Sequence, residues 1–224
     1  IERPVAAAEH IITYGDYDVD GTTATVLLKT AIERIAAKNR PAQVRYHVPH
    51  RLREGYGMQT GVLGDAAAAG VRLVISVDTG IRAFAAAREA RALGLDLIVT
   101  DHHLPDEAVG VPDALAVINP MQAECAYPFK HLCGAAVAFK LAHAILAAAA
   151  ETDEQRSRLK QTLIPSFLKL VAIATIADSV PLEGENRVIA ALGLRELQNP
   201  VQPGLRALMQ VAQVPTDRPP TATE

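Results

Sequence analysis

The segment DYDVDG (residues 16–21) places three aspartates, Asp16, Asp18 and Asp20, at alternate positions and ends in a glycine. Carboxylates this close repel each other when ionised, and each raises the pKa of the others. A bound cation would compensate the three charges. Groups of the same chemistry recur later in the chain, at Asp78 in SVDTG, at Asp101, His102 and His103 in TDHH, and at Asp178 in ATIADS.

Carboxylate oxygens and imidazole nitrogens dominate this set, and the two cysteines, Cys125 and Cys133, are too few for a thiolate cluster. Such a donor set suits Mn²⁺ or Mg²⁺ better than structural zinc. It also contains more carboxylates than one ion needs. Two ions about 3.5–4 Å apart that share a bridging aspartate would use them, and this is the architecture of many phosphoesterases.

Each group also has a simpler interpretation. DYDVDG resembles the first half of a calcium-binding loop, but the twelfth position of such a loop must be glutamate and is Leu27 here. Capping of a following helix by Asp20 or Thr22 would explain one of the three aspartates. Asp78 could belong to a turn, a histidine of TDHH could be a packed core residue, and Asp178 could close a helix. Together these explanations require four coincidences, so we favour the metal site.

The segments that precede these groups have the pattern of buried strands. Residues 10–15, 42–49, 71–78, 95–101 and 114–119 are short and largely apolar, and helical patterns cover residues 22–39 and 81–93. We therefore predict an α/β fold with a doubly wound, mainly parallel five-stranded sheet and helices on both faces. A helical segment follows from residue 134 and includes a helix over residues 166–178. Ligands of such sheets bind beyond the carboxyl ends of the strands, where the acidic and imidazole groups fall.

The overall composition bounds the kind of protein. The chain has 224 residues, is 50% hydrophobic and carries a net charge of −3. It can therefore bury a core, but it has no broad basic surface for coating nucleic acid. We expect no signal peptide and no membrane span, because no apolar run has the required length. The low cysteine count indicates free thiols in a reducing compartment, the cytoplasm.

Four motifs, DYDVDG, SVDTG, TDHH and ATIADSVPL, resemble in this order those of the DHH phosphoesterase superfamily. The segments YGDYDVDGTTA, YHVPHRLREGYGM, CGAAVAFKLAHAI and NRVIAALGLREL are similar to its RecJ group of single-strand-specific 5′-to-3′ exonucleases. The resemblance covers nearly the whole chain. Members that act on small substrates usually carry a histidine where this chain has Tyr14, which is not a plausible ligand of a divalent metal.

The resemblance implies a role for each carboxylate and histidine of the motifs. It implies two metal ions, the first held by Asp20, Asp78, His102 and Asp178, and the second by Asp16, Asp18 and the bridging Asp78. His103 is expected to face the phosphate, because adjacent side chains diverge, and Asp101 is expected to orient a ligand histidine. The implied catalytic residues are Asp78, Asp101, His102 and His103.

Three further positions are implied in substrate binding. Arg51 matches the position expected to hold a phosphate of the strand, for which the planar guanidinium is well suited. Tyr56 is expected either to stack on a base or to be a core aromatic beside a glycine turn. Gly134 is expected either to begin a helix whose free amides cradle a phosphate or to be a simple turn glycine.

By the same resemblance, the chain would be the core of a nuclease dependent on Mn²⁺ or Mg²⁺. It would release 5′-mononucleotides from single-stranded DNA, with the metal pair activating a water that attacks phosphorus, in DNA repair and recombination. One alternative is a small-substrate phosphodiesterase for oligoribonucleotides or cyclic dinucleotides, or an inorganic pyrophosphatase. The other is a non-catalytic replication scaffold, which the filled ligand positions disfavour.

The resemblance also suggests how the chain is divided. Residues 1–182 would form the catalytic domain, residues 183–213 a connecting helical segment, and residues 214–224 a linker or truncated end. A DHH-associated domain and an OB domain, which such enzymes carry further along, would be missing from this chain. Single-stranded DNA is the expected partner, and a single-strand-binding protein or a helicase is a candidate protein partner.

Overall fold

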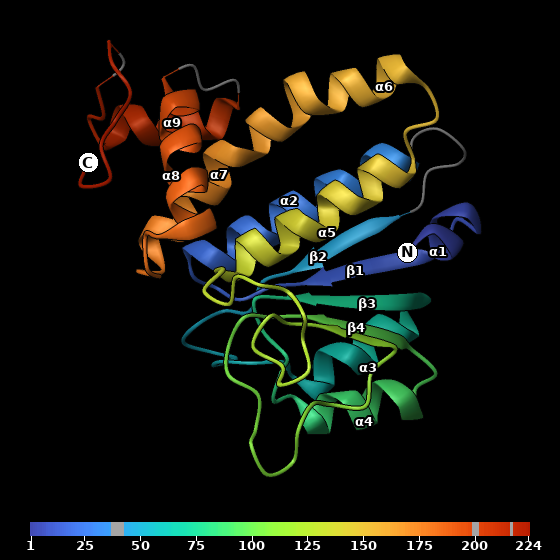
Figure 1. Cartoon of the computed structure of the whole chain (residues 1–224). Helices are drawn as coiled ribbons and strands as arrows, with labels where there is room; N and C mark the ends of the chain where they lie inside the picture. The colour runs from blue at the N-terminus through green and yellow to red at the C-terminus, as the bar shows by residue number, and fades with distance from the viewer. Residues whose placement is uncertain (37–42, 199–201, 216) are drawn as a thin grey trace.

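A five-stranded sheet forms the centre of the molecule (Figure 1), which is described here from a computed structural model covering residues 1–36, 43–198, 202–215 and 217–224. All strands pair in parallel, in the order β2-β1-β3-β4-β5. Their bounds are β1 His10–Tyr14, β2 Val44–His47, β3 Val71–Val77, β4 Asp96–Thr100 and β5 Ala116–Ile118. This order reverses direction between β1 and β3, and such a switch point is where doubly wound sheets bind their ligands. The predicted fold class is therefore confirmed.

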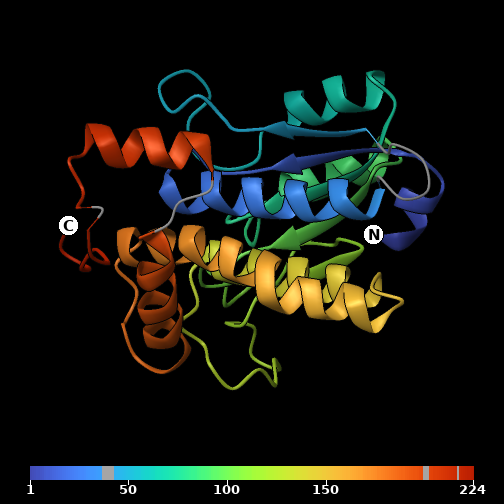
Figure 2. The same cartoon turned by 90° about the horizontal axis from the view of Figure 1, so that it is seen from above.

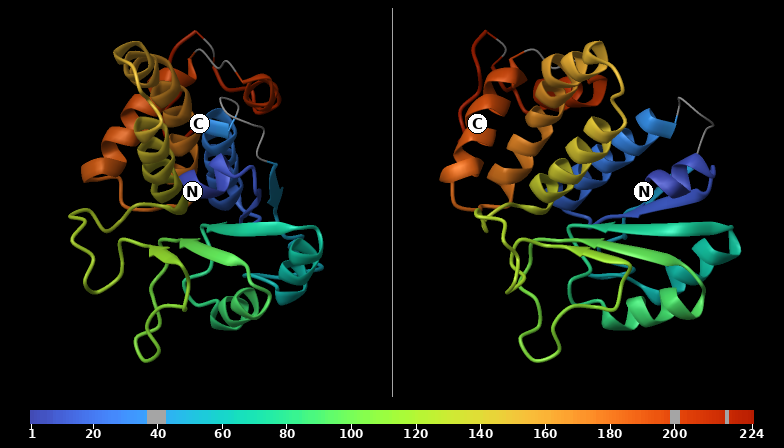
Figure 3. Two further views of the ribbon diagram at one scale, coloured as in Figure 1. Left: turned by 90° about the vertical axis from the view of Figure 1, so that its right-hand side faces the viewer. Right: turned by 45° about the vertical axis from the view of Figure 1, so that its right-hand side comes forward.

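Helices cover both faces of the sheet, which lies between two helical layers in the views of Figures 1 and 3. On one face lie α2 (Val19–Ala36), α5 (Gly134–Ala148) and α7 (Ile164–Ala177). They share with the sheet a core that contains Leu28, Ile75 and Val171. The other face is covered by α3 (Thr60–Ala68) and α4 (Phe84–Ala92), which enclose a second core with Val74 and Val99. The β-branched residues of the strands thus face apolar helices on either side.

The last part of the described chain is helical. A short helix α6 (Asp153–Arg158) begins at a capping box made by Thr152 and continues through a π-helical turn (Leu159–Leu163) into α7. Two further helices, α8 (Gly184–Leu197) and α9 (Pro203–Val211), follow. They pack against α7 around a small core that contains Leu197, Leu205 and Met209. In Figure 2, α7 runs alongside α2 and α5, and the last helices lie at one end of this layer.

The continuous helical run Asp153–Ala177 is long and apolar enough to cross a membrane by length and composition. We expected no apolar run of that length from the sequence. The charged residues in the first turns of this helical run interrupt its apolar pattern, which explains the difference. Its apolar residues Phe167, Val171 and Ala174 lie in the core shared with α2 and α5. Packing in that core explains their apolar character without a membrane.

The predicted strands and main helices are present, with three differences. The helix expected over residues 22–39 begins earlier, at Val19, and residues 37–39 of that prediction lie outside the described part of the chain. Residue 42 of the second predicted strand also lies outside it. Three helices, α1 (Glu2–Ala6), α3 and α6, were not predicted, because α1 and α6 are only five and six residues long and α3 contains two glycines.

Candidate metal centre

The three aspartates of DYDVDG occupy three different positions around the start of α2. Asp16 lies in the loop after β1 and is buried, and its carboxylate accepts a hydrogen bond from the Tyr17 amide at 2.7 Å. Asp18 is exposed and caps α2, accepting from the Gly21 amide at 2.8 Å. Asp20 lies in the first turn of α2 and is buried. The residue that caps the helix is therefore Asp18, not Asp20 or Thr22 as the sequence suggested.

Gly21 explains why this loop can pack so tightly. A Cβ at this position would lie 2.6 Å from the backbone nitrogen of Asp16. The missing side chain therefore lets the first turn of α2 lie directly against the aspartate that leaves β1.

Asp78 leaves the tip of β3 in a strained conformation. Its φ is +58°, in the left-handed region that non-glycine residues rarely adopt, and its side chain is buried. Strain of this kind costs of order 1–3 kcal/mol and persists where the surroundings hold the residue for function. The amide of Asp78 donates to the Thr100 carbonyl at the tip of β4, which fixes the carboxylate between the two strand ends.

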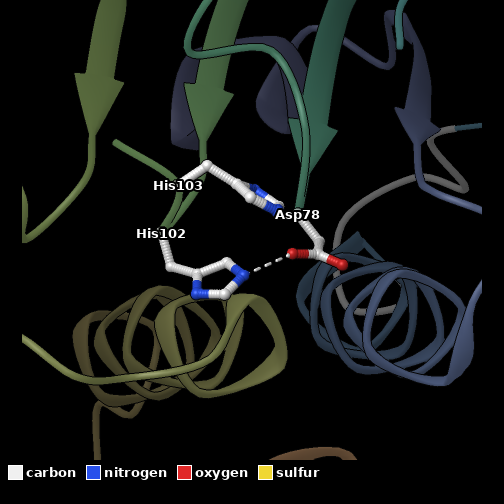
Figure 4. Close-up of side chains that lie close together, drawn as sticks. All are labelled: Asp78, His102 and His103. Carbon is white, nitrogen blue, oxygen red and sulfur yellow. Dashed lines mark ion pairs between the residues drawn. The ribbon is translucent and has the colours of Figure 1, made fainter. Parts of the chain in front are cut away.

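The TDHH segment places its two histidines next to each other at the tip of β4. The ring centroids of His102 and His103 are 4.4 Å apart. Figure 4 shows the imidazole of His102 turned toward the carboxylate of Asp78, and the His102 Nε2 to Asp78 Oδ1 distance is 3.2 Å. His103 also offers a nitrogen close to Asp78 and His102. The expected divergence of the two adjacent side chains is therefore wrong.

The carboxylate of Asp101 accepts several hydrogen bonds that fix the conformation of this segment. Its Oδ1 accepts hydrogen bonds from the amides of His102 and His103 and from Nδ1 of the His103 ring at 2.7 Å. Its Oδ2 accepts from the Ile81 amide at 2.9 Å, which links the loop after β3 to the loop after β4. Asp101 thus orients a histidine, but the histidine is His103 and not the expected metal ligand His102.

Asp178 and Asp20 approach His102 from the helical side. The His102 Nε2 atom lies 3.7 Å from an oxygen of Asp20 and 3.8 Å from an oxygen of Asp178, which ends α7. Potential ligand atoms within 4.8 Å of one another form three groups: Asp20 with His102 and Asp178, Asp16 with Asp18 and Asp78, and Asp78 with His102 and His103. Residues from four separate segments of the chain therefore converge at the switch point of the sheet.

Two buried atoms at the centre of these groups have no hydrogen-bond partner among the described residues. They are Asp78 Oδ1 and His102 Nε2, which lie close together without the alignment of a hydrogen bond. Buried polar atoms are nearly always paired, so an unpaired pair of this kind needs an explanation. One carboxylate oxygen and one imidazole nitrogen that face the same point are suitable ligands for a divalent cation. The residues present therefore fit a metal ion.

The electrostatics of the cluster lead to the same conclusion. Burial, and after it the charges of Asp20 and Asp18, raise the pKa of Asp78 far above its ordinary value. Burial and Asp20 likewise raise the pKa of Asp178. Burial raises the pKa of Asp16, and Asp18 adds to the rise. A divalent cation would favour the ionised form of all these carboxylates.

Gly134 supports the cluster in a way that the sequence did not suggest. The amides of Gly134 and Ala135, at the start of α5, donate to the two oxygens of Asp20 at 2.6 and 2.8 Å. These two amides are therefore not free to bind a phosphate. A Cβ at position 134 would lie 2.2 Å from Asp78 Oδ1, so the glycine leaves room for the Asp78 carboxylate.

The residues expected to bind substrate lie beside the cluster. The ring of Tyr56 meets that of His103 edge to face at a centroid distance of 6.3 Å, and Tyr56 is 58% exposed. It is therefore not a core aromatic. The guanidinium of Arg51 lies over the ring of Tyr17, 5.1 Å from its centroid. The buried Tyr14 hydroxyl donates to the Gly57 carbonyl and thereby anchors the loop that carries Tyr56.

Sequence reasoning missed two buried asparagines, of which one contacts the centre directly. Asn119 is buried after β5, and its side chain donates to the carbonyl of His103 at 2.8 Å. Its position at a strand exit on the same edge of the sheet is a signal that could have revealed it. Asn186 is buried in the first turn of α8 and donates to the carbonyls of His131 and Pro181. No local pattern distinguishes this asparagine from a surface residue of a helix.

Comparison with known proteins places this geometry in a family. The model of the DHH family, N-terminal domain, matches residues 10–175, which contain β1 to β5 and most of α7. The chain belongs to the DHH family. The matched residues, which form its DHH domain, include every candidate ligand except Asp178.

The relatives of this DHH domain include curated exonucleases. It is 41% identical over 212 residues to the single-stranded-DNA-specific exonuclease RecJ of Bacillus subtilis, a match covering 95% of this chain and 24% of the relative. With RecJ of Escherichia coli the identity is 38% over 206 residues, covering 90% of this chain and 34% of the relative. The chain thus spans about a quarter to a third of the length of these relatives.

Solved structures agree with the sequence relatives. A crystal structure of exonuclease RecJ bound to manganese superposes with a TM-score of 0.80 at 31% identity, over all of this chain and 51% of that one. RecJ from Thermus thermophilus in complex with Mn²⁺ gives a TM-score of 0.72 at 29% identity, over 94% of this chain and 28% of that one.

Proposed function

We propose that this DHH domain is the catalytic core of a RecJ-like exonuclease that hydrolyses single-stranded DNA from the 5′ end and releases 5′-mononucleotides. The observation that carries the proposal is the unpaired contact between Asp78 Oδ1 and His102 Nε2 within three overlapping groups of metal ligands. The similarity to curated RecJ exonucleases supports this substrate over dinucleotides or pyrophosphate. The filled ligand positions support an enzyme over a scaffold.

The residues divide between two ions as their groups suggest. Asp20, Asp78, His102 and Asp178 would hold one ion, and Asp16, Asp18 and Asp78 would hold the other. Mn²⁺ is the first candidate, since RecJ structures contain it, and Mg²⁺ is the second. When bound, such ions supply Lewis-acid stabilisation of the phosphoryl oxygens and activate a water molecule.

The remaining residues position the substrate and the ligands. Asp101 engages Nδ1 of His103, so Nε2 is the ring nitrogen left to face a phosphate oxygen of the scissile bond. The guanidinium of Arg51, on the exposed loop after β2, binds a phosphate further along the strand. The exposed ring of Tyr56 stacks on a base. Phosphate contacts of this kind make strand binding sensitive to salt.

The bacterial relatives support an inference about the cellular setting. DNA repair and recombination in a bacterial cytoplasm is the setting we infer, with single-stranded DNA as the partner. A single-strand-binding protein or a helicase is a candidate for delivering the strand. The longer relatives carry further sequence beyond the part that matches, and we expect the complete protein to bind DNA more tightly than this domain.

The test measures strand degradation and metal binding together. A 5′-phosphorylated single-stranded oligonucleotide is incubated with the wild-type chain, with Asp78→Ala and with Asp65→Ala, in Mn²⁺ or with chelator. Asp65 is an exposed residue of α3 and serves as the matched control. We expect mononucleotides from the 5′ end that require Mn²⁺ and disappear only in Asp78→Ala. Mn²⁺-dependent release by Asp78→Ala at the wild-type rate would contradict the assignment.

A further inference from the structure

A cleft of about 790 Å³ opens beside the metal centre, on the side of the sheet covered by α4. It shares Asp101, His102 and His103 with the centre, and Tyr56 forms part of its wall. Its volume lies within the ~300–1,000 Å³ that is usual for small-molecule sites. A group attached to a phosphate at the centre would therefore have this cleft directly beside it.

The lining of the cleft is mainly apolar. Met58, Ala83, Ala85 and Leu104 contribute to its wall together with the exposed ring of Tyr56. Small side chains on α4 keep the cleft wide, and the ring of Tyr56 has one edge-on aromatic neighbour, His103, among the described residues. A flat, largely apolar ring system with a wide π-face is the kind of group that such a wall accepts.

Two charged side chains of the wall, Arg82 and Asp101, make hydrogen bonds within the protein. Arg82 donates from its guanidinium to the carbonyls of Leu104 and Pro105, at 2.9 and 3.3 Å. Both oxygens of Asp101 accept hydrogen bonds from neighbouring amides or from His103. These hydrogen bonds hold both side chains in place and leave few of their groups to read the donors and acceptors on the edge of a base, which is how proteins distinguish one base from another.

We propose that this cleft binds the nucleobase of the terminal nucleotide, without regard to which base it is. The inference rests on the proposed function, because the metal centre must hold the phosphodiester for the base to reach the cleft. Met58, Ala83 and Ala85 are the new contact residues, and Tyr56 covers the base from one side. Arg82 is a positioning residue that holds the loop after β4 in place.

Binding of small ligands tests the cleft without requiring strand degradation. In Mn²⁺ buffer, the dissociation constant of dTMP is compared with that of 2-deoxyribose 5-phosphate, which lacks the base. Stacking on an aromatic contributes enough that we expect dTMP to bind about 5- to 150-fold more tightly. The four mononucleotides should agree within about fivefold, since each base-reading contact would add at least that much discrimination.

Two substitutions in α4 test whether the higher affinity for dTMP arises in this cleft. Ala85→Phe places a ring in the cleft at an exposed position, whereas Ala92→Phe makes the same change at an exposed position of α4 outside the cleft. We expect Ala85→Phe to lose at least fivefold in dTMP affinity and nothing in sugar-phosphate affinity. Ala92→Phe should behave as the wild type. Circular dichroism spectra of both variants establish that the fold is unchanged.

The outcomes separate this proposal from the proposed function. Equal affinity of the wild type for dTMP and 2-deoxyribose 5-phosphate would overturn the base site and leave the nuclease untouched. Fivefold or larger differences among the four bases would overturn its lack of selectivity. A preference for dTMP that Ala85→Phe abolishes would support the base site even if the chain failed to degrade a strand, a failure that would count against the proposed function alone.

Discussion

Substitution of Gly134 by alanine gives the sharpest test of how the metal centre is built. Gly134 is the first residue of α5 and has an ordinary helical backbone, so alanine would normally stabilise it by up to about 1 kcal/mol. The new methyl group, however, would lie 2.2 Å from Asp78 Oδ1 and 2.5 Å from its Cβ and Cγ. The Asp78 side chain, which is buried and held at positive φ, would have to move.

The magnitudes predict an outcome in which function suffers more than stability. Overpacking a core costs about 1–3 kcal/mol, so after the gain in helix propensity we expect a net loss of about 0–2 kcal/mol. For a chain of this size that corresponds to a fall in Tm of at most about 8 °C. Displacement of the ligand common to the assigned ions should meanwhile lower Mn²⁺ affinity by tenfold or more, since ~1.4 kcal/mol of lost binding suffices.

The assay is isothermal titration with Mn²⁺ combined with thermal unfolding in chelator. Gly64→Ala, in the middle of α3, is the matched control, because a Cβ there would meet no atom within 4 Å. We expect Gly64→Ala to raise the Tm by up to about 4 °C and to bind Mn²⁺ as the wild type does. If Gly134→Ala showed the same raised Tm and unchanged Mn²⁺ affinity, the close approach of α5 to Asp78 would not matter and our account of the centre would be refuted.

Two further predictions concern the helices behind the centre. Asn186→Ala leaves the carbonyls of His131 and Pro181 without their buried donor and should cost about 1–3 kcal/mol on thermal unfolding. It should also weaken Mn²⁺ binding, because the turn that it releases follows Asp178. Burial would raise the pKa of Glu185, but hydrogen bonds from Lys140 and Tyr127 outweigh it and lower this pKa below the ordinary 4.5. The ionised group therefore contributes stability above pH 4.5 that is lost as the pH falls through the folded-state pKa, and Glu185→Gln should flatten the acid limb of a stability-versus-pH curve.

Each of these predictions has its own control. For Asn186→Ala, unfolding is followed with and without Mn²⁺, and an unchanged metal-induced shift in Tm would separate Asn186 from the centre. For Glu185→Gln, the same change at the exposed Glu107 should leave the acid limb as it is in the wild type. Identical acid limbs for wild type and Glu185→Gln would argue against the contribution of the Lys140 contact.

Much of the fold could be predicted because its strands are continuous apolar runs. Leu73 to Val77, for example, are buried on both sides of the sheet, so the run itself reports the strand. The strand exits then pointed to the candidate ligands, since Asp78 follows directly after β3 and the segment of His102 follows β4. Helix α3 escaped prediction because Gly61 and Gly64 weaken its helical pattern, and only its packing on the sheet makes it a helix.

The details of the centre depend on contacts between distant segments, which local patterns do not contain. Asp20 and Gly134 meet across a long stretch of sequence, so nothing near either residue reveals that the amides of α5 are already occupied. The orientation of His102 and His103 is likewise set by Asp101 and Asn119, from the tip of β4 and from the segment after β5. Residue types predicted the chemistry of the site, and tertiary packing determined which group faces which.

The assigned ligands are far apart in the sequence, so they become available at different times during synthesis. Asp16 emerges from the ribosome well before Asp178, which follows all five strands of the sheet and α7. Parallel pairing requires each strand to wait for a partner beyond a crossover, and such topologies fold slowly. A partly synthesised chain therefore cannot assemble both assigned ligand groups. Binding of metal by the complete set of assigned ligands would therefore begin only after this part of the chain has been synthesised and folded.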